Sequence, residues 1–293
     1  MKNKKIIHNT LVGYGFLFPN IAGFLLFTSL PVIVSFVLTF LQWDILTPPK
    51  FIGLANWINL VKDKDFWYYL YNTFFFMLGI PLKMIVALAL ALLVNHKLKG
   101  IVIFRTIFFL PVVCSTVAIA LIWNWIYNPD FGLLNAFLRW IGMYSPPQWL
   151  SSTKWAKPAI IIMEVWVGAG YTMLLYLAAL QGIPAELYEA ADIDGASSWQ
   201  KFMNITFPML AFVNFFIVIM AIIGGFQAFG TQYVLTGGGP AGSTTTIVYH
   251  IYNHAFKWFN MGYASTIAWF LFGIMFVVTL VQWSRGKSGE TNY

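Results

Sequence analysis

Long apolar stretches separated by short polar links dominate the pattern along this chain. A helix that crosses a bilayer needs about 20 mostly apolar residues. Six stretches meet this requirement: Phe16–Leu41, Thr73–Val94, Phe104–Ile126, Pro158–Leu180, Met209–Phe229 and Tyr263–Trp283. The first is longer than a bilayer needs and contains Pro19 and Pro31, so we expect it to tilt, to kink or to begin on the membrane surface.

This pattern predicts an all-α integral membrane protein with about six transmembrane helices. The composition agrees, because 9% of the residues are charged and 59% are hydrophobic, whereas soluble domains carry about 25% charged residues. The net charge of +7 does not point to nucleic acid. A basic excess on such an apolar chain is typical of contacts with membrane headgroups on the cytoplasmic side.

Basic residues near the ends of the stretches predict the orientation. If there are six spans, one side of the membrane receives Lys2, Lys4, Lys5, Lys97, Lys99, Arg105, Arg285 and Lys287. Cytoplasmic loops are enriched in lysine and arginine, so this side, with both termini, is expected in the cytoplasm. The first stretch far exceeds the apolar core of a signal peptide, which is about 7–15 residues, so we expect it to be retained.

No link between the stretches is long enough to form a soluble domain. We therefore predict a single transmembrane domain over residues 1–293, with short interfacial helices on the outer side where tryptophan and tyrosine gather. The one cysteine, Cys114, lies in an apolar run and is expected to be a small buried apolar residue. His250 and His254 have a spacing that suits one helix face, but no third ligand is evident nearby, so we predict no metal site.

The polar segment 181–208 separates the fourth stretch from the fifth and is expected in the cytoplasm. Its pattern predicts two short helices. Pro184 suits a first helical turn, and Gly195 suits a left-handed exit from the first helix. Ser197 and Gln200 have the spacing of a capping box that starts the second helix.

Small residues in this segment lie beside acids, which is a combination that suits close approach by a partner. Ala190, Ala191 and Gly195 leave room for another backbone, and Glu189 and Asp194 supply negative charge. The residues alone leave two readings open: a compact projection that fits a socket on another protein, or an ordinary solvated loop.

The run EAADIDGA at 189–196, followed by Phe202, Ile205 and Pro208, resembles the EAA signature of permease subunits of bacterial ABC importers. Further segments are similar to the sugar-uptake branch of that family, which includes the larger maltose permease and the permeases for glycerol-3-phosphate and oligosaccharides. These segments are FLFPNIAGFLLFTSLPVIVSF (16–36), FIGLANW (51–57), NPDFGLLN (128–135), TGGGPAGST (236–244) and MGYASTIAW (261–269). The chain departs from the larger maltose permease in lacking its additional N-terminal spans and its large external domain.

The resemblance implies a type I ABC importer permease fold in the bacterial cytoplasmic (inner) membrane. It implies that loop 181–208 docks on an ABC ATPase dimer, with Glu189 facing a basic residue, Asp194 holding the turn, and contacts from Ala190, Ala191, Gly195 and Phe202. The implied partners are a second homologous permease subunit and an extracytoplasmic solute-binding protein that delivers the sugar. ATP and magnesium would be bound by the ATPase and not by this chain.

The sequence itself contains no Walker A motif, so we predict a non-catalytic subunit without a bound cofactor. The glycine-rich run 237–245 imitates a phosphate-binding loop but lacks the lysine and is expected outside the cell. We interpret it as an external turn, with contact to the binding protein as one role for it.

Polar groups within spans are costly and are usually functional. Lys83 and Glu164 are the two charges inside the predicted spans, about 10 Å apart in depth at 1.5 Å per residue. Aromatic faces and amides suit sugar rings and hydroxyls, so we predict a solute path that includes Trp166, Gly168, Tyr171, Phe226 and Gln227. The part VWVGAGY also resembles the sugar-contacting stretch of the maltose permease. The alternative is that the aromatic residues belong to the core or face lipid.

Three further readings compete with a sugar importer permease. An ABC permease for glycerol-3-phosphate or another polar solute needs positive groups in the path, where Lys83 is the single intramembrane candidate. A stand-alone secondary transporter needs acids for ion coupling, where only Glu164 is available. An intramembrane enzyme is disfavoured, because the spans contain no cluster of His, Asp or Cys.

Overall fold

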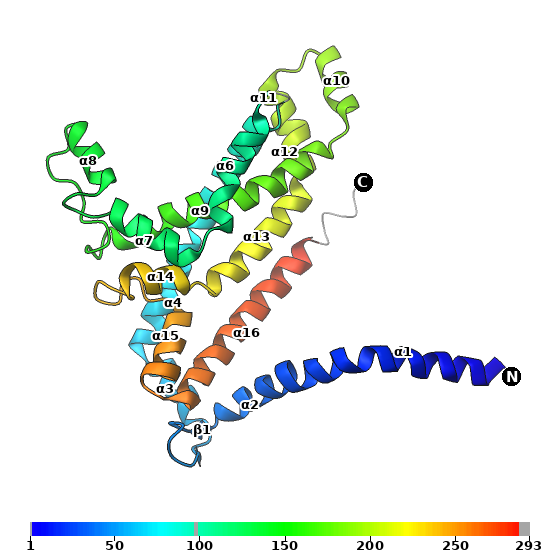
Figure 1. Ribbon diagram of the computed structural model, residues 1–293, viewed down its shortest axis with the longest axis vertical. Helices are drawn as coiled ribbons and strands as arrows, with labels where there is room; N and C mark the ends of the chain where they lie inside the picture. The colour runs from blue at the N-terminus through cyan, green and yellow to red at the C-terminus, as the bar shows by residue number, and fades with distance from the viewer. Residues whose placement is uncertain (1, 97–98, 287–293) are drawn as a thin grey trace. The chain divides into compact units, whose positions relative to one another are not determined.

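A computed structural model describes residues 2–96 and 99–286 (Figure 1). Lys97 and Lys287, which entered the orientation argument, lie outside these residues. In chain order the elements are α1 (Lys2–Phe24), η1 (Leu25–Ser29), α2 (Leu30–Leu38), β1 (Leu41–Gln42), β2 (Lys50–Phe51), α3 (Ala55–Lys62), α4 (Lys64–Met77), α5 (Gly79–Val94), α6 (Ile101–Val113), α7 (Thr116–Ile126), α8 (Leu133–Trp140), α9 (Ala156–Gln181), α10 (Ala185–Ile193), α11 (Ser198–Lys201), η2 (Phe202–Thr206), α12 (Phe207–Met209), α13 (Ala211–Phe226), α14 (Gly230–Thr236), α15 (Ile247–Tyr252), η3 (Asn253–Lys257) and α16 (Met261–Gly286). The prediction of an all-α membrane protein is confirmed.

Four helical segments of the described chain are long and apolar enough to cross a membrane: Val12–Leu38, Lys64–Val94, Ala156–Gln181 and Met261–Gln282. Two bent pairs raise the number to six if each pair is one span, and these pairs are Ile101–Val113 with Thr116–Ile126 and Ser198–Met209 with Ala211–Phe226. The first span is a long helix in which η1, a π-helical turn, connects α1 to α2. The six predicted stretches are therefore found, but the third is broken within its length, and the fifth is bent at its start and ends as a helix at Phe226.

The third predicted stretch, Phe104–Ile126, is broken rather than continuous. Its helices α6 and α7 meet at an angle of 101°, and the backbone of Cys114 and Ser115 between them is extended. Pro111 lies in the last turn of α6 and cannot donate a backbone hydrogen bond there. The break exposes Cys114, so the expectation of a buried cysteine is wrong.

The chain divides into two compact units, and each is described by itself. The first contains the described part of Met1–Asp63 with Ile251–Phe272. Here β1 pairs antiparallel with β2, with Leu41 opposite Phe51. The buried Asn56 side chain donates hydrogen bonds of 3.0 Å to the carbonyl oxygens of Thr39 and Leu41. Trp269 Nε1 donates to Ser35 Oγ at 3.1 Å, which joins α16 to α2.

The second unit contains Lys64–His250 and the described part of Gly273–Tyr293. Its central helix α9 packs against α5 and α6. The contact with α6 is close because Gly170 has no side chain, and a Cβ atom there would collide with the carbonyl oxygen of Phe108. The apolar core between these helices includes Ala87, Ala91 and Met173. Small residues allow such close packing of helices within membranes.

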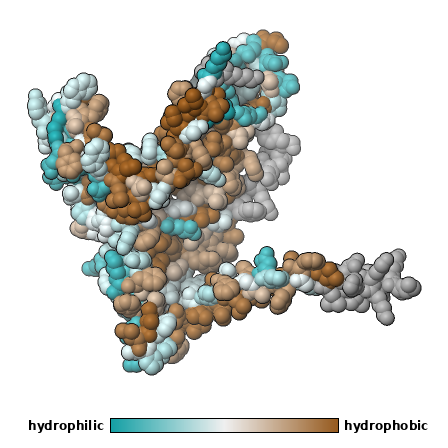
Figure 2. All heavy atoms as spheres, viewed as in Figure 1, coloured by the Kyte–Doolittle hydropathy of each residue, from teal (hydrophilic) through white to brown (hydrophobic). Residues whose placement is uncertain are grey.

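Helices α10 and α11 lie at the end of α13 that is far from α14 (Figure 1). Hydrophilic residues gather over this tip, and hydrophobic surface covers the helices that lead to it (Figure 2). Loop 181–208 is therefore separated along the unit from the region where α6, α7, α9 and α14 meet.

Candidate functional site

The first helix of loop 181–208 is α10, which begins at Ala185, one residue after Pro184. Pro184 is thus the N-cap residue rather than a member of the first turn. At the other end the Ala196 N–H donates to the Ala191 carbonyl at 2.9 Å, and the Gly195 N–H donates to the Asp192 carbonyl at 3.1 Å. This pair of bonds is a Schellman motif. It places Gly195 at φ +73°, which confirms the predicted left-handed exit.

The second helix of the loop begins with the predicted capping box. Ser197 Oγ accepts a hydrogen bond from the Gln200 backbone N–H at 3.4 Å, and the Ser197 N–H donates to Gln200 Oε1 at 2.7 Å. The two bonds satisfy N–H groups that would otherwise be unpaired at the start of α11. The loop is therefore an ordered helix–turn–helix and not an irregular connection.

Two further contacts join the two helices of the loop. Tyr188 Oη lies 2.9 Å from Thr206 Oγ1, and Lys201 Nζ lies 2.7 Å from Asp192 Oδ1. Neither pair follows from the family signature. The sequence analysis missed both because the paired residues are 18 and 9 positions apart. They join α10 to the start of the next helix across the turn of the loop.

The predicted coupling residues are arranged along an exposed edge of this loop. Glu189, Ala190, Asp194 and Gly195 are exposed, and Ala191 and Phe202 are half-buried. The apolar side chains of Ile193 and Trp199 are also exposed, at 87% and 68%. The sequence analysis did not assign Ile193 to the site. The signal was available, because an isoleucine between two acids, Asp192 and Asp194, is expected to be exposed.

A largely apolar cavity of about 480 Å³ lies beside the loop and is lined by Leu92, Tyr188, Ser198, Trp199, Lys201, Phe202 and Thr206. Phe202 stacks on Trp199 at 5.6 Å between ring centroids. The loop thus combines charge, small residues and an accessible aromatic surface. An arrangement of this kind suits a protein partner better than it suits a small polar ligand.

A second cavity, of about 190 Å³, lies where α6 breaks into α7. Its lining comes from α6, α7, α9, α14 and the α6–α7 break and consists of Pro111, Val112, Cys114, Thr116, Ile119, Met163, Glu164, Val167, Gly168 and Thr231. The break therefore creates a concave space beside a predicted span. The sequence pattern read this region as one straight helix and gave no signal for the cavity.

Glu164 presents the charged group of this cavity. Its Oε1 atom accepts a hydrogen bond of 3.0 Å from Nε2 of Gln232, whose side chain is fully buried. The other intramembrane charge, Lys83, lies against Gly168, because a Cβ atom on this glycine would come within 2.7 Å of Lys83 Cδ. Lys83 and Glu164 interact electrostatically, but the two side chains form no ion pair within 4.0 Å.

The five residues predicted for the solute path are not all at this cavity. Gly168 lines it. Trp166 and Tyr171 are half-exposed, and Trp166 contacts Trp123 edge-on at 5.6 Å between ring centroids. Phe226 is buried against Phe74, so it belongs to the core, as the alternative reading held. Gln227 is exposed after the end of α13. Their roles in transport stay predictions.

The glycine-rich run 237–245 is a compact turn that follows α14. Asn72 Nδ2 donates to the carbonyl oxygens of Gly242 and Thr245, at 3.0 and 2.9 Å. Thr244 and Thr245 donate to the carbonyls of Gly239 and Gly238. The threonine hydroxyls and the asparagine amide therefore bond to carbonyl groups inside the turn. In a phosphate-binding loop the interior is instead open to a ligand.

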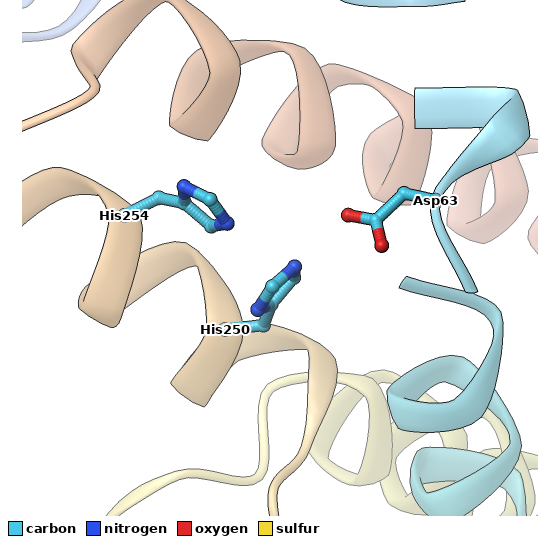
Figure 3. Close-up of side chains that lie close together, drawn as sticks. All are labelled: Asp63, His250 and His254. Atoms are coloured by element: carbon cyan, nitrogen blue, oxygen red, sulfur yellow. The ribbon is translucent and has the colours of Figure 1, made fainter. Parts of the chain in front are cut away.

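The two histidines considered in the sequence lie on successive turns, His250 in α15 and His254 in η3. Within the first unit, the Asp63 carboxylate and the His254 ring have donor atoms within 4.8 Å of one another (Figure 3). Tyr263 Oη donates a hydrogen bond to the same carboxylate. Asp63 is far from the histidines in the sequence and was not considered there. The absence of a metal stays a prediction.

The fold is that of a polytopic helical membrane protein, and known proteins define its class further. Residues 26–284 match the family described as the binding-protein-dependent transport system inner membrane component. The chain therefore belongs to this family of transport permeases, as its EAA-like signature indicated.

Individual relatives match nearly the whole chain. The lactose transport system permease protein LacF of Rhizobium radiobacter is 38% identical over 281 residues, covering 94% of each chain. The trehalose/maltose transport system permease protein MalF of Thermococcus litoralis is 36% identical over 278 residues, again covering 94% of each. A chain of the bacterial alginate ABC transporter, solved in complex with an alginate pentasaccharide-bound periplasmic protein, matches with a TM-score of 0.83 at 25% identity, covering 95% of this chain and 94% of that chain.

Proposed function

We propose that this chain is the permease subunit of an ATP-driven importer and forms one half of the path for a sugar or oligosaccharide. Support comes from the family match over residues 26–284 and from relatives that are named for lactose and for trehalose and maltose. The chain itself does no chemistry in this proposal. A partner ATPase dimer binds ATP and magnesium, and a second homologous permease forms the other half of the path.

The observation that carries the proposal is the ordered loop 181–208. It presents Glu189, Ala190 and Gly195 on an exposed edge, and its turn is held by a Schellman motif and a capping box. A rigid projection transmits the movement of a partner, whereas a flexible loop absorbs it. In the proposed arrangement this loop and both termini are cytoplasmic, and the loop docks on the ATPase.

The opposite side of the membrane receives the solute from an extracytoplasmic binding protein in this proposal. The structural neighbour was solved with such a periplasmic protein. The charge of the solute is left open by these relatives, because lactose, trehalose and maltose are neutral sugars and alginate is an acidic polysaccharide.

The test is transport by the complete importer, reconstituted from this chain, its partner permease, the ATPase and the binding protein. Replacing Glu189→Gln should lower ATP-driven uptake and the stimulation of ATP hydrolysis by the loaded binding protein, with unchanged insertion into the membrane. Glu186→Gln is the matched control, since Glu186 is an exposed glutamate on the same short helix. Uptake by the purified chain alone, without an ATPase, would contradict the proposal and favour a secondary transporter.

A further inference from the structure

We propose that the cavity at the α6–α7 break selects solutes by charge through Glu164, so that the importer takes neutral or amine-bearing sugars and rejects acidic ones. The inference rests on the proposed function, because it assumes that this cavity belongs to the solute path. It adds a substrate class that the relatives leave open.

The lining of the cavity gives the first argument. Of the described residues that line it, Glu164 is the one that carries a carboxylate or a cationic group. Thr116 and Thr231 add hydroxyl groups, and the remaining lining is apolar apart from Cys114. The volume of about 190 Å³ is below the roughly 300–1,000 Å³ of pockets that hold drug-sized ligands. The cavity therefore fits one portion of an oligosaccharide at a time, and that portion meets Glu164.

The position of Glu164 gives the second argument. Its carboxyl group accepts a hydrogen bond from Gln232, and Gln232 is a neutral, fully buried donor on α14. Such a bond fixes the orientation of the carboxyl group without cancelling its charge. Lys83 interacts electrostatically with Glu164, but it forms no ion pair with it within 4.0 Å and does not line the cavity. The carboxyl group is thus held in place, and Glu164 lines the open space.

A carboxylate in the lining is expected to repel acidic solutes and to admit neutral or cationic ones. Two like charges a few ångströms apart at an effective dielectric constant of about 20 repel strongly enough to weaken binding on the order of 100-fold. A sugar hydroxyl instead donates a hydrogen bond to the carboxylate, and a sugar ammonium adds a favourable charge interaction. A uronic acid in this cavity would meet repulsion with no compensating cation in the lining.

Cys114 offers a direct probe of the charge in this space. It is the only cysteine of the chain, it is exposed, and it lines the same cavity as Glu164. The experiment compares the rates at which a cationic and an anionic methanethiosulfonate of similar size label Cys114 in the assembled importer in membranes. Mildly alkaline buffer ensures that the thiolate reacts. Rates with a small thiol in solution correct for the intrinsic reactivity of each reagent.

The corrected ratio of cationic to anionic labelling should be about 10 or more, because a cleft lined by one sign of charge concentrates counterions by this factor or more. Glu164→Gln should bring the ratio close to one. Glu186→Gln, which removes an exposed carboxylate from loop 181–208, should leave the ratio unchanged. Cys114→Ala should abolish labelling and so confirm the assignment of the signal.

A ratio close to one in the unmodified importer would overturn the inference, and this outcome needs no variant to fold. A second variant, Thr231→Glu, adds a carboxylate to the lining and should raise the ratio further, and an unchanged ratio there would also contradict the inference. The result is separable from the proposed function. A high ratio without ATP-driven uptake would overturn the proposed function, and selection by an importer with it, and would leave only the negative potential of the cavity, whereas normal uptake with a ratio near one would overturn charge selection alone.

Discussion

Loop 181–208 and the cavity at the α6–α7 break differ in how the chain builds them. The loop is one contiguous segment whose shape comes from local caps and a left-handed glycine. The cavity is assembled from residues as far apart as Pro111, Glu164 and Thr231. The difference teaches that a surface for a partner protein can be encoded locally, whereas a space for a solute depends on the packing of distant helices.

The two regions also differ in what a substitution disturbs. Beside the cavity, α9 packs closely against α6 at Gly170, so added volume at this contact has nowhere to go. Side chains on the loop are mostly exposed, so their replacement alters local geometry more than global packing. The following four predictions use matched pairs of positions to separate these effects, from the largest expected change to the smallest.

Gly170→Ala should cause the largest loss of stability, about 2–3 kcal/mol, because its Cβ would overlap the backbone of α6 at Phe108. Gly168→Ala is the matched control, since its Cβ would meet the flexible stem of Lys83, which can move. Thermal unfolding of the purified protein in detergent would check this. Equal losses at the two positions would show that α6 and α9 do not pack through Gly170.

Gly195→Val should disturb the loop by about 1–2 kcal/mol, because a β-branched residue is strained at φ +73°. The proposed consequence is a fall in coupled transport of roughly tenfold, which is what 1.4 kcal/mol represents, with normal membrane insertion. Gly182→Ala is the control, because Gly182 has a negative φ of −84°. Wild-type transport by Gly195→Val would refute a coupling role for this turn.

Ser197→Ala should weaken the start of α11 by about 1 kcal/mol, because the capping bond to the Gln200 N–H is lost. Faster limited proteolysis within loop 181–208 would report this change. Ser198→Ala serves as the control, since Ser198 is the next residue but does not occupy the cap position. Identical proteolysis of both variants would mean that the cap does not hold the loop.

Lys201→Ala should have the smallest effect, below about 1 kcal/mol, because its ion pair with Asp192 is solvent-accessible and pairs of this kind contribute little. A double-mutant cycle with Asp192→Ala, measured by the same proteolysis at low and high salt, would isolate the pair. A coupling energy that does not fall with salt would contradict its assignment as an exposed ion pair.

Local signals explain what the sequence could predict. Apolar runs of sufficient length indicated the spans, and the capping box and Gly195 indicated the helices of the loop, because caps depend on neighbouring residues. The bend between α6 and α7 was missed because hydropathy reports how apolar a segment is and not whether its helix is straight. Phe104–Ile126 is apolar on both sides of the break. The exposure of Cys114 followed from the same bend.

Long-range pairing explains the rest of what was missed. The hydrogen bond from Gln232 to Glu164 joins positions 68 residues apart, and the one between Tyr188 and Thr206 joins the two ends of the loop. No periodicity or motif specifies such partners. Phe226 shows the converse problem, because an aromatic residue near a predicted path has the same sequence signal whether it lines the path or packs against Phe74 in the core.

Cross-linking of loop 181–208 tests the central claim of ATPase docking most directly. In a Cys114→Ala background, Ala190→Cys places a single thiol on the exposed edge of the loop, and Tyr144→Cys places one at a fully accessible position outside the loop. A short bifunctional reagent in membranes that contain the complete importer should join Ala190→Cys to the ATPase and leave Tyr144→Cys unattached to it. An ATPase adduct at Tyr144→Cys with none at Ala190→Cys would contradict the account.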